Sequence, residues 1–356
     1  MKTTFQTLAC VLLLSTSAGY ARPQHPFPHK KEIYKKGWID FNKNGKKDIY
    51  EDPTQDIEKR IDDLLSQMNL DEKTCQLATY YGYRKALKDS VPTAEWKTNI
   101  LKDGIANVDE HLNKEIGDPN TLATALAETQ RFFVEYTRLG IPADFTNEGI
   151  RGLNARSATS FPSMNGLGCT WDKELAYRQG VIEGREARAM GYTNIYAPIL
   201  DVARDQRWGR WEGAIGEDPY LVARIGVAMS KGIQSQRVVS TPKHYVGYGD
   251  CKAARQWDSR TDPHVTPSEM YYIHEYPFRK VFQEAGALGV MCAYNDYDGV
   301  PMAGNYHYLT KLWLELVKGP FELLVFDHHT DMQRPAFGGI LSCGGWIREA
   351  LETNEN

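Results

Sequence analysis

The chain has 356 residues, which is enough for one large α/β barrel or for two medium-sized domains. Hydrophobic residues make up 42% and charged residues 25%, as is ordinary for a globular protein. The formal net charge is −4 at pH 7 and no basic stripe is present, which argues against a nucleic-acid-binding protein.

The first 21 residues have the pattern of a secretory signal peptide. Met1 and Lys2 give a short positive start, residues 8–14 are apolar, and small residues lead to a cleavage site near residues 19–21. No segment has the ~20 consecutive apolar residues that a membrane-spanning helix needs. We therefore expect a secreted or periplasmic protein without membrane contact after removal of the signal.

Residues 22–56 form an N-terminal extension that contains a calcium-loop pattern. Residues 40–51 read DFNKNGKKDIYE and match D-x-[DN]-x-[DN]-G-x5-E. A calcium ion takes about seven oxygen ligands, and glycine at the sixth position allows the sharp turn of such a loop. The expected ligands are Asp40, Asn42, Asn44, Lys46 through its carbonyl oxygen, Asp48 and Glu51.

A polar turn rich in Asn, Asp and Gly is the alternative interpretation of residues 40–51. The pattern occurs once and no clear helix precedes it. We therefore predict a structural calcium ion that ties down the N-terminus rather than a calcium sensor, and no cofactor for catalysis.

From about Ile57, helical segments alternate with short apolar runs. Apolar residues spaced three and four positions apart predict helices at 57–68, 121–139, 172–190, 219–234 and 267–285. Capping signals mark their starts, such as Asp172 and the pair Asp218–Pro219.

The apolar runs between these helices predict strands at 141–145, 194–200, 238–242 and 287–293. Repeated strand–helix units imply a parallel sheet with crossover helices. A doubly wound open sheet should show a glycine-rich turn after its first strand, and none is found. We therefore predict an α/β fold, a (β/α)8 TIM-type barrel over residues 57–318 that is incomplete at its C-terminal end.

Polar residues follow each expected strand. Glu148 follows the first, Arg210 the second, Lys243 and His244 the third, and Tyr294 the fourth. The C-terminal strand ends of such a barrel assemble its active site. Each residue alone could be a helix cap, a salt-bridge partner or a buried core residue. Together, a carboxylate, cationic donors and an aromatic wall fit the polar groups around a sugar ring.

Long, ordered motifs around these residues resemble glycoside hydrolase family 3. They are GIPADFTNEG at 140–149, DVARDQRWGRWEGAIGEDPY at 201–220, TPKHYVGYG at 241–249 and VMCAYNDYDG at 290–299. Residues 60–73, RIDDLLSQMNLDEK, are similar to the first barrel helix of the family. The resemblance covers residues 57–313 and is to the N-terminal barrel domain of the β-glucosidase or β-xylosidase type.

This resemblance implies a retaining, exo-acting β-glycosidase that removes terminal glucose or xylose from β-linked oligosaccharides. On this chain, the residues that match the family's sugar-holding positions are Glu148, Arg210, Lys243, His244 and Tyr294. The resemblance does not choose between the two sugars.

The family's catalytic nucleophile is an aspartate at a later strand end, and here the resemblance fades after Thr310. Asp327, which follows the apolar run 321–326, lies near the expected position and is the candidate nucleophile. The acid/base residue of the family comes from a second domain or a later loop. We therefore expect residues 319–356 to be a divergent tail, with no acid/base residue supplied by the chain.

The tail offers a further motif, because Asp327, His329 and Asp331 alternate as in the metal-binding strand of arginase-like ureohydrolases. Three functions thus stay open: a glycosidase that uses Asp327, a sugar-binding remnant without turnover, and a metal-dependent hydrolase. Ancestry favours the first. For turnover by this chain, the sugar-binding remnant is favoured, because each missing catalytic group lowers the rate by several powers of ten.

Overall fold

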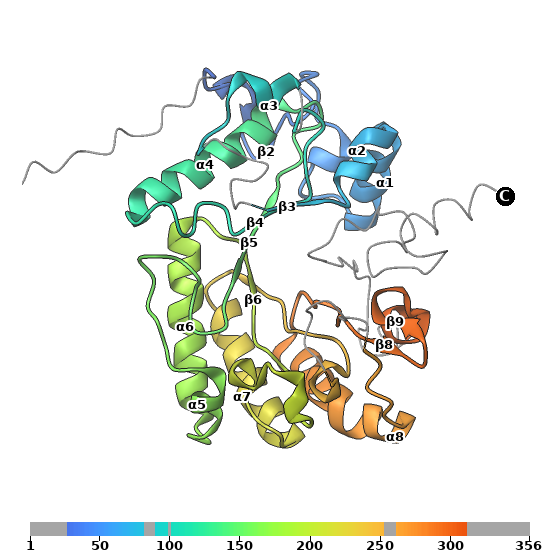
Figure 1. The fold of residues 1–356 in the computed structure, drawn as a ribbon. Helices are drawn as coiled ribbons and strands as arrows, with labels where there is room; N and C mark the ends of the chain where they lie inside the picture. Colours follow the sequence, from blue (N-terminus) through green and yellow to red (C-terminus); the bar gives the residue numbers. More distant parts are fainter. Residues whose placement is uncertain (1–26, 82–89, 99–100, 253–260, 312–356) are drawn as a thin grey trace, which may run out of the picture.

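The computed structural model describes residues 27–81, 90–98, 101–252 and 261–311. The expected signal peptide, the tail at 319–356 and the residues Asp327, His329 and Asp331 lie outside this part of the chain. Figure 1 shows the N-terminal elements through α4 in its upper half and the later helices in its lower half. Strands run between the two groups.

A parallel sheet of five strands forms the centre of the described chain. The strands are β3 (Thr79–Tyr81), β4 (Asn107–Asp109), β5 (Asp144–Glu148), β6 (Asn194–Tyr196) and β7 (Val239–Ser240). Their order in the sheet is the order in the sequence. The predicted α/β fold is confirmed. This sequential order is that of a barrel, whereas a doubly wound sheet reverses its strand order at a switch point.

Three features of the sheet differ from the sequence-based prediction. The strand expected at 141–145 is instead β5, at 144–148, so that Glu148 is its last residue, and the strands expected at 194–200 and 238–242 are shorter, at 194–196 and 239–240. Strands β3 and β4 were not predicted, because three-residue runs with polar members carry no clear periodicity.

The third difference concerns residues 287–293, which do not form a regular strand. Tyr245 bridges Cys292, and its backbone N–H donates to the carbonyl of Met291 at 2.8 Å. The Met291 N–H in turn donates to the carbonyl of Pro242 at 3.0 Å. This segment therefore extends the sheet beyond β7 by backbone hydrogen bonds without continuous strand geometry.

The α-helices cover the sheet or join its strands. They are α1 (Ile57–Gln67), α2 (Leu70–Cys75), α3 (Ala94–Thr98), α4 (Pro119–Tyr136), α5 (Met164–Gly168), α6 (Lys173–Met190), α7 (Pro219–Gln234), α8 (Pro267–Glu269) and α9 (Glu275–Lys280). The π-helical segment Met270–His274 joins α8 to α9, and a second one, Val281–Ala285, extends α9, so that 267–285 is one continuous helical stretch. All five predicted helices are present, with ends shifted by at most a few residues. No helix in the described ranges is long and apolar enough to cross a membrane.

Shorter elements complete the chain. Two antiparallel pairs are β1 (Tyr34–Lys35) with β2 (Trp38–Ile39), and β8 (Asp296–Tyr297) with β9 (Val300–Pro301). Single turns of 3-10 helix are η1 (Lys31–Ile33), η2 (Ile49–Glu51), η3 (Gln206–Trp208), η4 (Trp211–Gly213), η5 (Tyr248–Asp250) and η8 (Met302–Gly304). A π-helical turn, η9, spans His307–Lys311.

Side-chain capping starts the long helices where the sequence predicts it. Asp172 accepts hydrogen bonds from the N–H groups of Glu174 and Leu175, at 2.9 and 3.1 Å. Asp218 accepts from the N–H of Leu221 at 2.7 Å, with Pro219 at the first helical position. These caps satisfy N–H groups that have no partner within the helix.

Helices α6 and α7 pack closely because glycines line their contact. A Cβ placed on Gly180 would lie 2.4 Å from the carbonyl oxygen of Met229, and one on Gly232 would lie 2.3 Å from that of Tyr177. Both distances are shorter than any real Cβ contact, so only glycine fits at these two positions. Figure 1 shows the two helices side by side.

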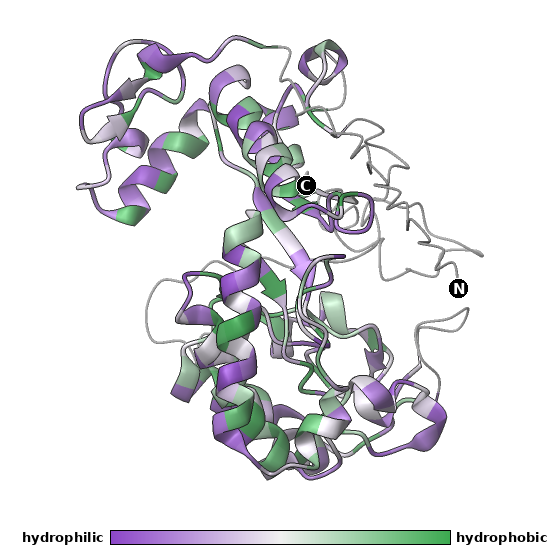
Figure 2. Ribbon diagram, turned by 90° about the vertical axis from the view of Figure 1, so that its left-hand side faces the viewer, coloured by the Kyte–Doolittle hydropathy of each residue, from purple (hydrophilic) through white to green (hydrophobic). Residues whose placement is uncertain are grey.

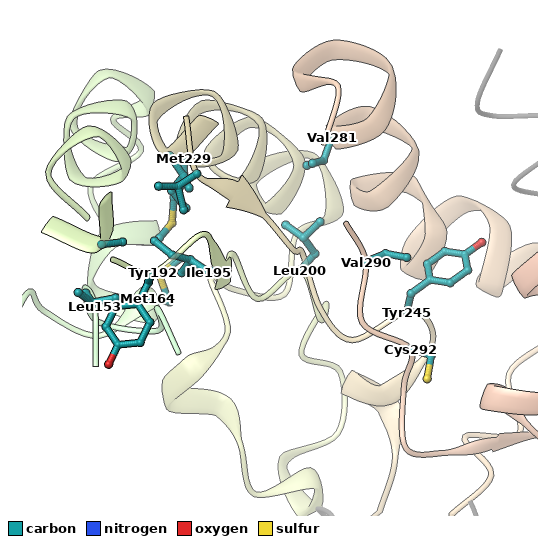
Figure 3. Packing of buried hydrophobic residues seen from close by; sticks show 14 of the residues in the cluster. Leu153, Met164, Tyr192, Ile195, Leu200, Met229, Tyr245, Val281, Val290 and Cys292 are labelled. Carbon is teal, nitrogen blue, oxygen red and sulfur yellow. The ribbon is translucent and has the colours of Figure 1, made fainter. Parts of the chain in front are cut away.

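The hydrophobic core lies between the sheet and these helices. Figure 3 shows Ile195 and Tyr192 next to Met229 of α7, and Leu200 between these residues and Val290. Ile195, Tyr192, Met229 and Leu200 are fully buried. Figure 2 shows hydrophobic and hydrophilic stretches alternating along the helices, as expected when one face packs and the other meets solvent. This packing fixes the strands whose ends carry the candidate site.

Candidate functional site

The five residues predicted from the sequence lie at the C-terminal ends of the central strands. Glu148 ends β5, and Lys243 and His244 follow β7 by a few residues. Tyr294 follows the segment that hydrogen-bonds beside β7. Arg210 lies beyond β6, at the N-cap position of η4.

Lys243 and Glu148 form an ion pair between two strand ends. The ammonium group donates a hydrogen bond to Oε2 of Glu148. The Lys243 side chain is 1% exposed and that of Glu148 is 22% exposed. Burial lowers the pKa of Lys243, and the Glu148 carboxylate opposes this shift by favouring the charged ammonium. Glu148 is therefore held in place while part of its carboxylate remains accessible as an acceptor.

His244 is fixed by a second buried pair. Its Nδ1 lies 2.7 Å from Oδ2 of Asp201, and its backbone N–H donates to Oδ1 of the same carboxyl group at 3.3 Å. Burial raises the pKa of Asp201 to about 7, while the nearby guanidinium of Arg210 acts in the opposite direction. The pair sets the orientation of the imidazole, so that Nε2 faces away from Asp201.

Tyr248 of η5 joins the remaining residues of the site. Its ring lies 5.2 Å from the ring of His244 and 5.2 Å from that of Tyr294, measured between centroids. The guanidinium carbon of Arg210 lies 5.6 Å from the centroid of the same ring. In the described part of the chain, Nη1 of Arg210 is buried without a hydrogen-bond partner. Such a donor is suited to an oxygen of a ligand.

The structure therefore brings the five predicted residues into one region, and it adds three that the sequence interpretation did not assign. Asp201 and Tyr248 lie within the quoted motifs but carried no predicted role. Asp109, at the end of β4, was missed together with its strand. The mostly polar residues 107–111, which follow a short apolar run, are the sequence pattern that could have indicated Asp109.

Asp109 is a buried carboxyl group close to the Lys243–Glu148 pair. It accepts a hydrogen bond from the hydroxyl of Thr146 at 2.6 Å. Burial raises the pKa of Asp109 to about 7, the Glu148 charge raises it further, and Lys243 opposes the shift. One buried ammonium thus faces two carboxyl groups.

Glu183 of α6 is a third carboxyl group near this region. It is fully buried, and neither of its oxygens has a hydrogen-bond partner among the described residues. Burial raises the pKa of Glu183 well above its ordinary value. A Cβ on Gly149, the residue after Glu148, would lie 1.9 Å from Oε1 of Glu183, so this glycine leaves room for the carboxyl group.

The predicted calcium ligands lie in the segment that follows β2 and ends with η2. Asp40 and Glu51 are buried, and Gly45 has φ +78°, the left-handed conformation expected at the sharp turn. No group of three or more His, Cys, Asp or Glu side chains within the described ranges is arranged to hold a metal ion without other residues. A metal in this loop would also need the amide oxygens of Asn42 and Asn44.

Comparison with known proteins gives a family match for most of the chain. A family model described as "Glycosyl hydrolase family 3 N terminal domain" matches residues 69–336. The match continues past residue 318, where the sequence interpretation ended the barrel, and it includes Asp327.

Individual relatives agree with this match. The chain is 34% identical over 217 residues to a β-xylosidase of Formosa agariphila, covering 56% of the chain and 30% of the relative. It is 31% identical over 286 residues to a periplasmic β-glucosidase/β-xylosidase of Dickeya chrysanthemi, covering 72% and 42%. The chain thus spans less than half the length of these relatives.

Among solved structures, a β-glucosidase from Erythrobacter marinus is similar with a TM-score of 0.64 and 28% identity, over 74% of this chain and 35% of that one. A β-glucosidase from Listeria innocua, solved with laminaribiose, is similar with a TM-score of 0.61 and 26% identity, over 74% and 36%. The motifs, the strand order, the family match and these likenesses agree, and the chain belongs to glycoside hydrolase family 3.

Proposed function

We propose that the chain binds the non-reducing terminal sugar of a β-linked oligosaccharide and acts as a retaining, exo-acting β-glycosidase. The observation that carries this proposal is the arrangement of two buried pairs, Lys243–Glu148 and Asp201–His244, at neighbouring strand ends. Such pairs hold polar groups in a fixed geometry, which is what recognition of several sugar hydroxyls requires.

Each residue of the site has a role that follows from its chemistry. The accessible part of the Glu148 carboxylate accepts hydrogen bonds from sugar hydroxyls, and its contact with Lys243 holds it in place. Arg210 and His244 supply donors for hydroxyl oxygens through Nη1 and the imidazole. The partly exposed ring of Tyr294 offers an apolar face to the C–H groups of the sugar.

Turnover needs two further carboxyl groups about 5–5.5 Å apart in a retaining enzyme. We assign the nucleophile to Asp327, whose carboxylate would attack the anomeric carbon as the leaving alcohol takes a proton from an acid/base residue. Water, deprotonated by that residue, would then release the sugar from the covalent intermediate. The acid/base residue is not assigned.

The relatives support both candidate sugars and an exported protein. Their names include β-xylosidase and β-glucosidase, and a structure of the Listeria innocua enzyme contains glucose. The relatives from Dickeya chrysanthemi and Salmonella typhimurium are described as periplasmic. Together with the signal-peptide pattern at residues 1–21, this supports a periplasmic or secreted location.

The test is hydrolysis of 4-nitrophenyl β-xyloside and β-glucoside by the purified chain, together with calorimetric titration of xylose and glucose. Asp327→Asn should abolish hydrolysis and leave sugar binding intact, whereas Asp331→Asn should leave both unchanged. Glu148→Gln should weaken binding.

Sugar binding without any turnover would refute the catalytic part and indicate the sugar-binding protein that the sequence also allows. Hydrolysis lost in both Asp327→Asn and Asp331→Asn, and removed by a chelator, would indicate the metal-dependent hydrolase instead. Absence of binding and of turnover in folded protein would refute the proposal as a whole.

A further inference from the structure

The loop 40–51 is fixed by hydrogen bonds between its own backbone and its acidic side chains. Oδ2 of Asp40 accepts from the N–H of Gly45 at 3.0 Å. The Glu51 carboxylate spans the loop, accepting from the N–H of Asn42 at 3.2 Å and from that of Asp48 at 3.1 Å. The first and last acidic residues thus close the loop from opposite ends.

One oxygen of the Asp40 carboxylate has no hydrogen-bond partner among the described residues. Its side chain is 4% exposed, and Oδ1 is buried without a hydrogen-bond partner in the described part of the chain. Oδ2 of the same carboxylate accepts from Gly45 within the loop, so the unpartnered Oδ1, bonded to the same carbon, lies next to that contact. Leaving a buried carboxylate oxygen without a partner is costly, and a cation removes that cost.

Two side-chain amide groups of the loop contact the carboxylate of Asp48. The side-chain N–H groups of Asn42 and Asn44 both donate to Oδ2 of Asp48, the latter at 2.7 Å. Rotation of these amides would exchange nitrogen for oxygen and turn two donors into two ligands. The acidic side chains do not form a metal centre by themselves, but the calcium-loop pattern also uses these amide oxygens and a backbone carbonyl.

Within the described residues, no lysine of the loop forms a direct ion pair with Asp40 or Glu51. The ammonium group of Lys43 donates to the carbonyl of Thr137 at 2.6 Å, and that of Lys47 pairs with Asp52 at 2.7 Å. Lys46 is exposed. Lys46 and Lys47 thus carry their charges at the surface, Lys43 directs its ammonium to the Thr137 carbonyl, and two of the three acidic side chains, Asp40 and Glu51, are buried.

We propose that residues 40–51 bind one calcium ion through side-chain oxygens of Asp40, Asn42, Asn44, Asp48 and Glu51 and the carbonyl oxygen of Lys46. The unpartnered Asp40 oxygen and the loop geometry carry this assignment. A loop with this many oxygen ligands suits calcium better than magnesium, which demands a tighter octahedron and keeps several waters.

The ion would act as a clamp between the N-terminal segment and the entry to β5. Tyr50, in the loop, donates its hydroxyl to the carbonyl of Leu139 at 3.3 Å. Gly140 has φ +62° and lies close to Phe41. A Cβ on Gly140 would lie 2.7 Å from the carbonyl oxygen of Phe41. Arg60 of α1 donates two hydrogen bonds to the carbonyl of Tyr50. The loop therefore braces both α1 and the segment that leads into β5.

The experiment measures calcium binding by the full chain and its effect on thermal stability. Terbium luminescence, sensitised by Tyr50 and Trp38, reports occupancy of the loop, and calorimetry with calcium gives the affinity. Glu51→Gln removes a ligand of the loop. Asp52→Asn is the matched control, since it removes the same charge one residue outside the loop.

We expect a Kd of about 10⁻⁵–10⁻³ M and a Tm about 2 °C higher at tenfold excess of calcium over that Kd than in EDTA. Glu51→Gln should weaken binding at least tenfold and remove the Tm shift, while Asp52→Asn should retain both. Asn44→Ala, at an exposed position, provides a second variant if Glu51→Gln does not fold. Equal binding by Glu51→Gln and Asp52→Asn, or no binding by the unaltered chain at millimolar calcium, would overturn the proposal.

Discussion

Oδ2 of Asp201 lies 2.7 Å from Nδ1 of His244, and each of these side chains is 1% exposed. Two residues from different parts of the chain thus form one rigid unit, because Asp201 follows β6 and His244 follows β7. A ring held at Nδ1 by a buried carboxyl group presents its other nitrogen in a fixed direction. Asp201 is therefore a positioning residue for His244.

Asp201→Asn should weaken sugar binding by about 10- to 100-fold, because a misoriented imidazole loses one hydrogen bond to the ligand, on the order of 1.5–3 kcal/mol. Calorimetric titration with glucose and xylose measures the change. Asp205→Asn is the control, since Asp205 caps η3 in the same loop and asparagine caps equally well. Equal affinity of the two variants would contradict the positioning role.

The site residues could be predicted from the sequence because their motifs are long and have a fixed order. Glu148, Lys243 and His244 were placed at strand ends without knowledge of the contacts that they make. Tyr248 could not be assigned in this way, because its role depends on contacts of its ring with Tyr294 and Arg210, which come from two other segments. Such contacts come from tertiary packing and leave no local pattern.

The fold class could be predicted for a similar reason, whereas individual strands could not. Long helices such as α6 and α7 show a clear period and caps, so that their ends are found within a few residues. Strand β4 has three residues, two of them polar and all of them buried. Its polar side chains form hydrogen bonds with neighbouring strands, as when Asn107 donates to the hydroxyl of Thr146. No periodicity in the sequence therefore indicates this strand.

Substitutions of Lys243 and Glu148 should have strongly non-additive effects on the free energy of unfolding. Glu148→Gln leaves a buried ammonium without its main partner and should destabilise the protein by about 2–4 kcal/mol, since breaking a buried pair costs about 3–5 kcal/mol and Asp109 compensates in part. Adding Lys243→Met removes the unpaired charge and should recover part of that loss. Urea unfolding of the two single variants and the double variant measures the coupling energy. Additive effects of the two substitutions would show that the pair is not coupled.

Stability should fall as the pH rises from about 4 to about 7. The pKa values of Asp109 and Asp201 are raised from 3.8 to about 7, so within this window the folded chain holds protons that the unfolded chain has released. Above pH 7 both states have lost them, and this contribution becomes constant. Urea unfolding at several pH values gives the slope of the unfolding free energy.

Asp109→Asn should reduce that slope by the amount that corresponds to about one bound proton. Asp205→Asn should not change it, because the hydrogen bond from Arg207 lowers the pKa of Asp205 to about 2, below the window. An unaltered slope in Asp109→Asn would mean that Asp109 is ionised in the folded protein throughout this pH range.

The contact between α6 and α7 should be sensitive to a single methyl group. Gly180→Ala places a Cβ 2.4 Å from a backbone oxygen of α7, which cannot move without shifting the helix. We expect a loss of about 1–3 kcal/mol in the free energy of unfolding. Urea denaturation followed by circular dichroism measures it.

Gly166→Ala in α5 is the matched control, because the nearest atom to its Cβ would be 3.4 Å away, at a side chain. Alanine there should be neutral or stabilising by up to about 1 kcal/mol, since it lowers the entropy cost of helix formation. Because α6 leads into β6 and α7 into β7, a wider helix contact should also disturb the strand ends that carry Asp201 and Lys243. Gly180→Ala should therefore weaken sugar binding together with stability. A variant that loses stability but binds with unchanged affinity would show that the site does not depend on this helix contact.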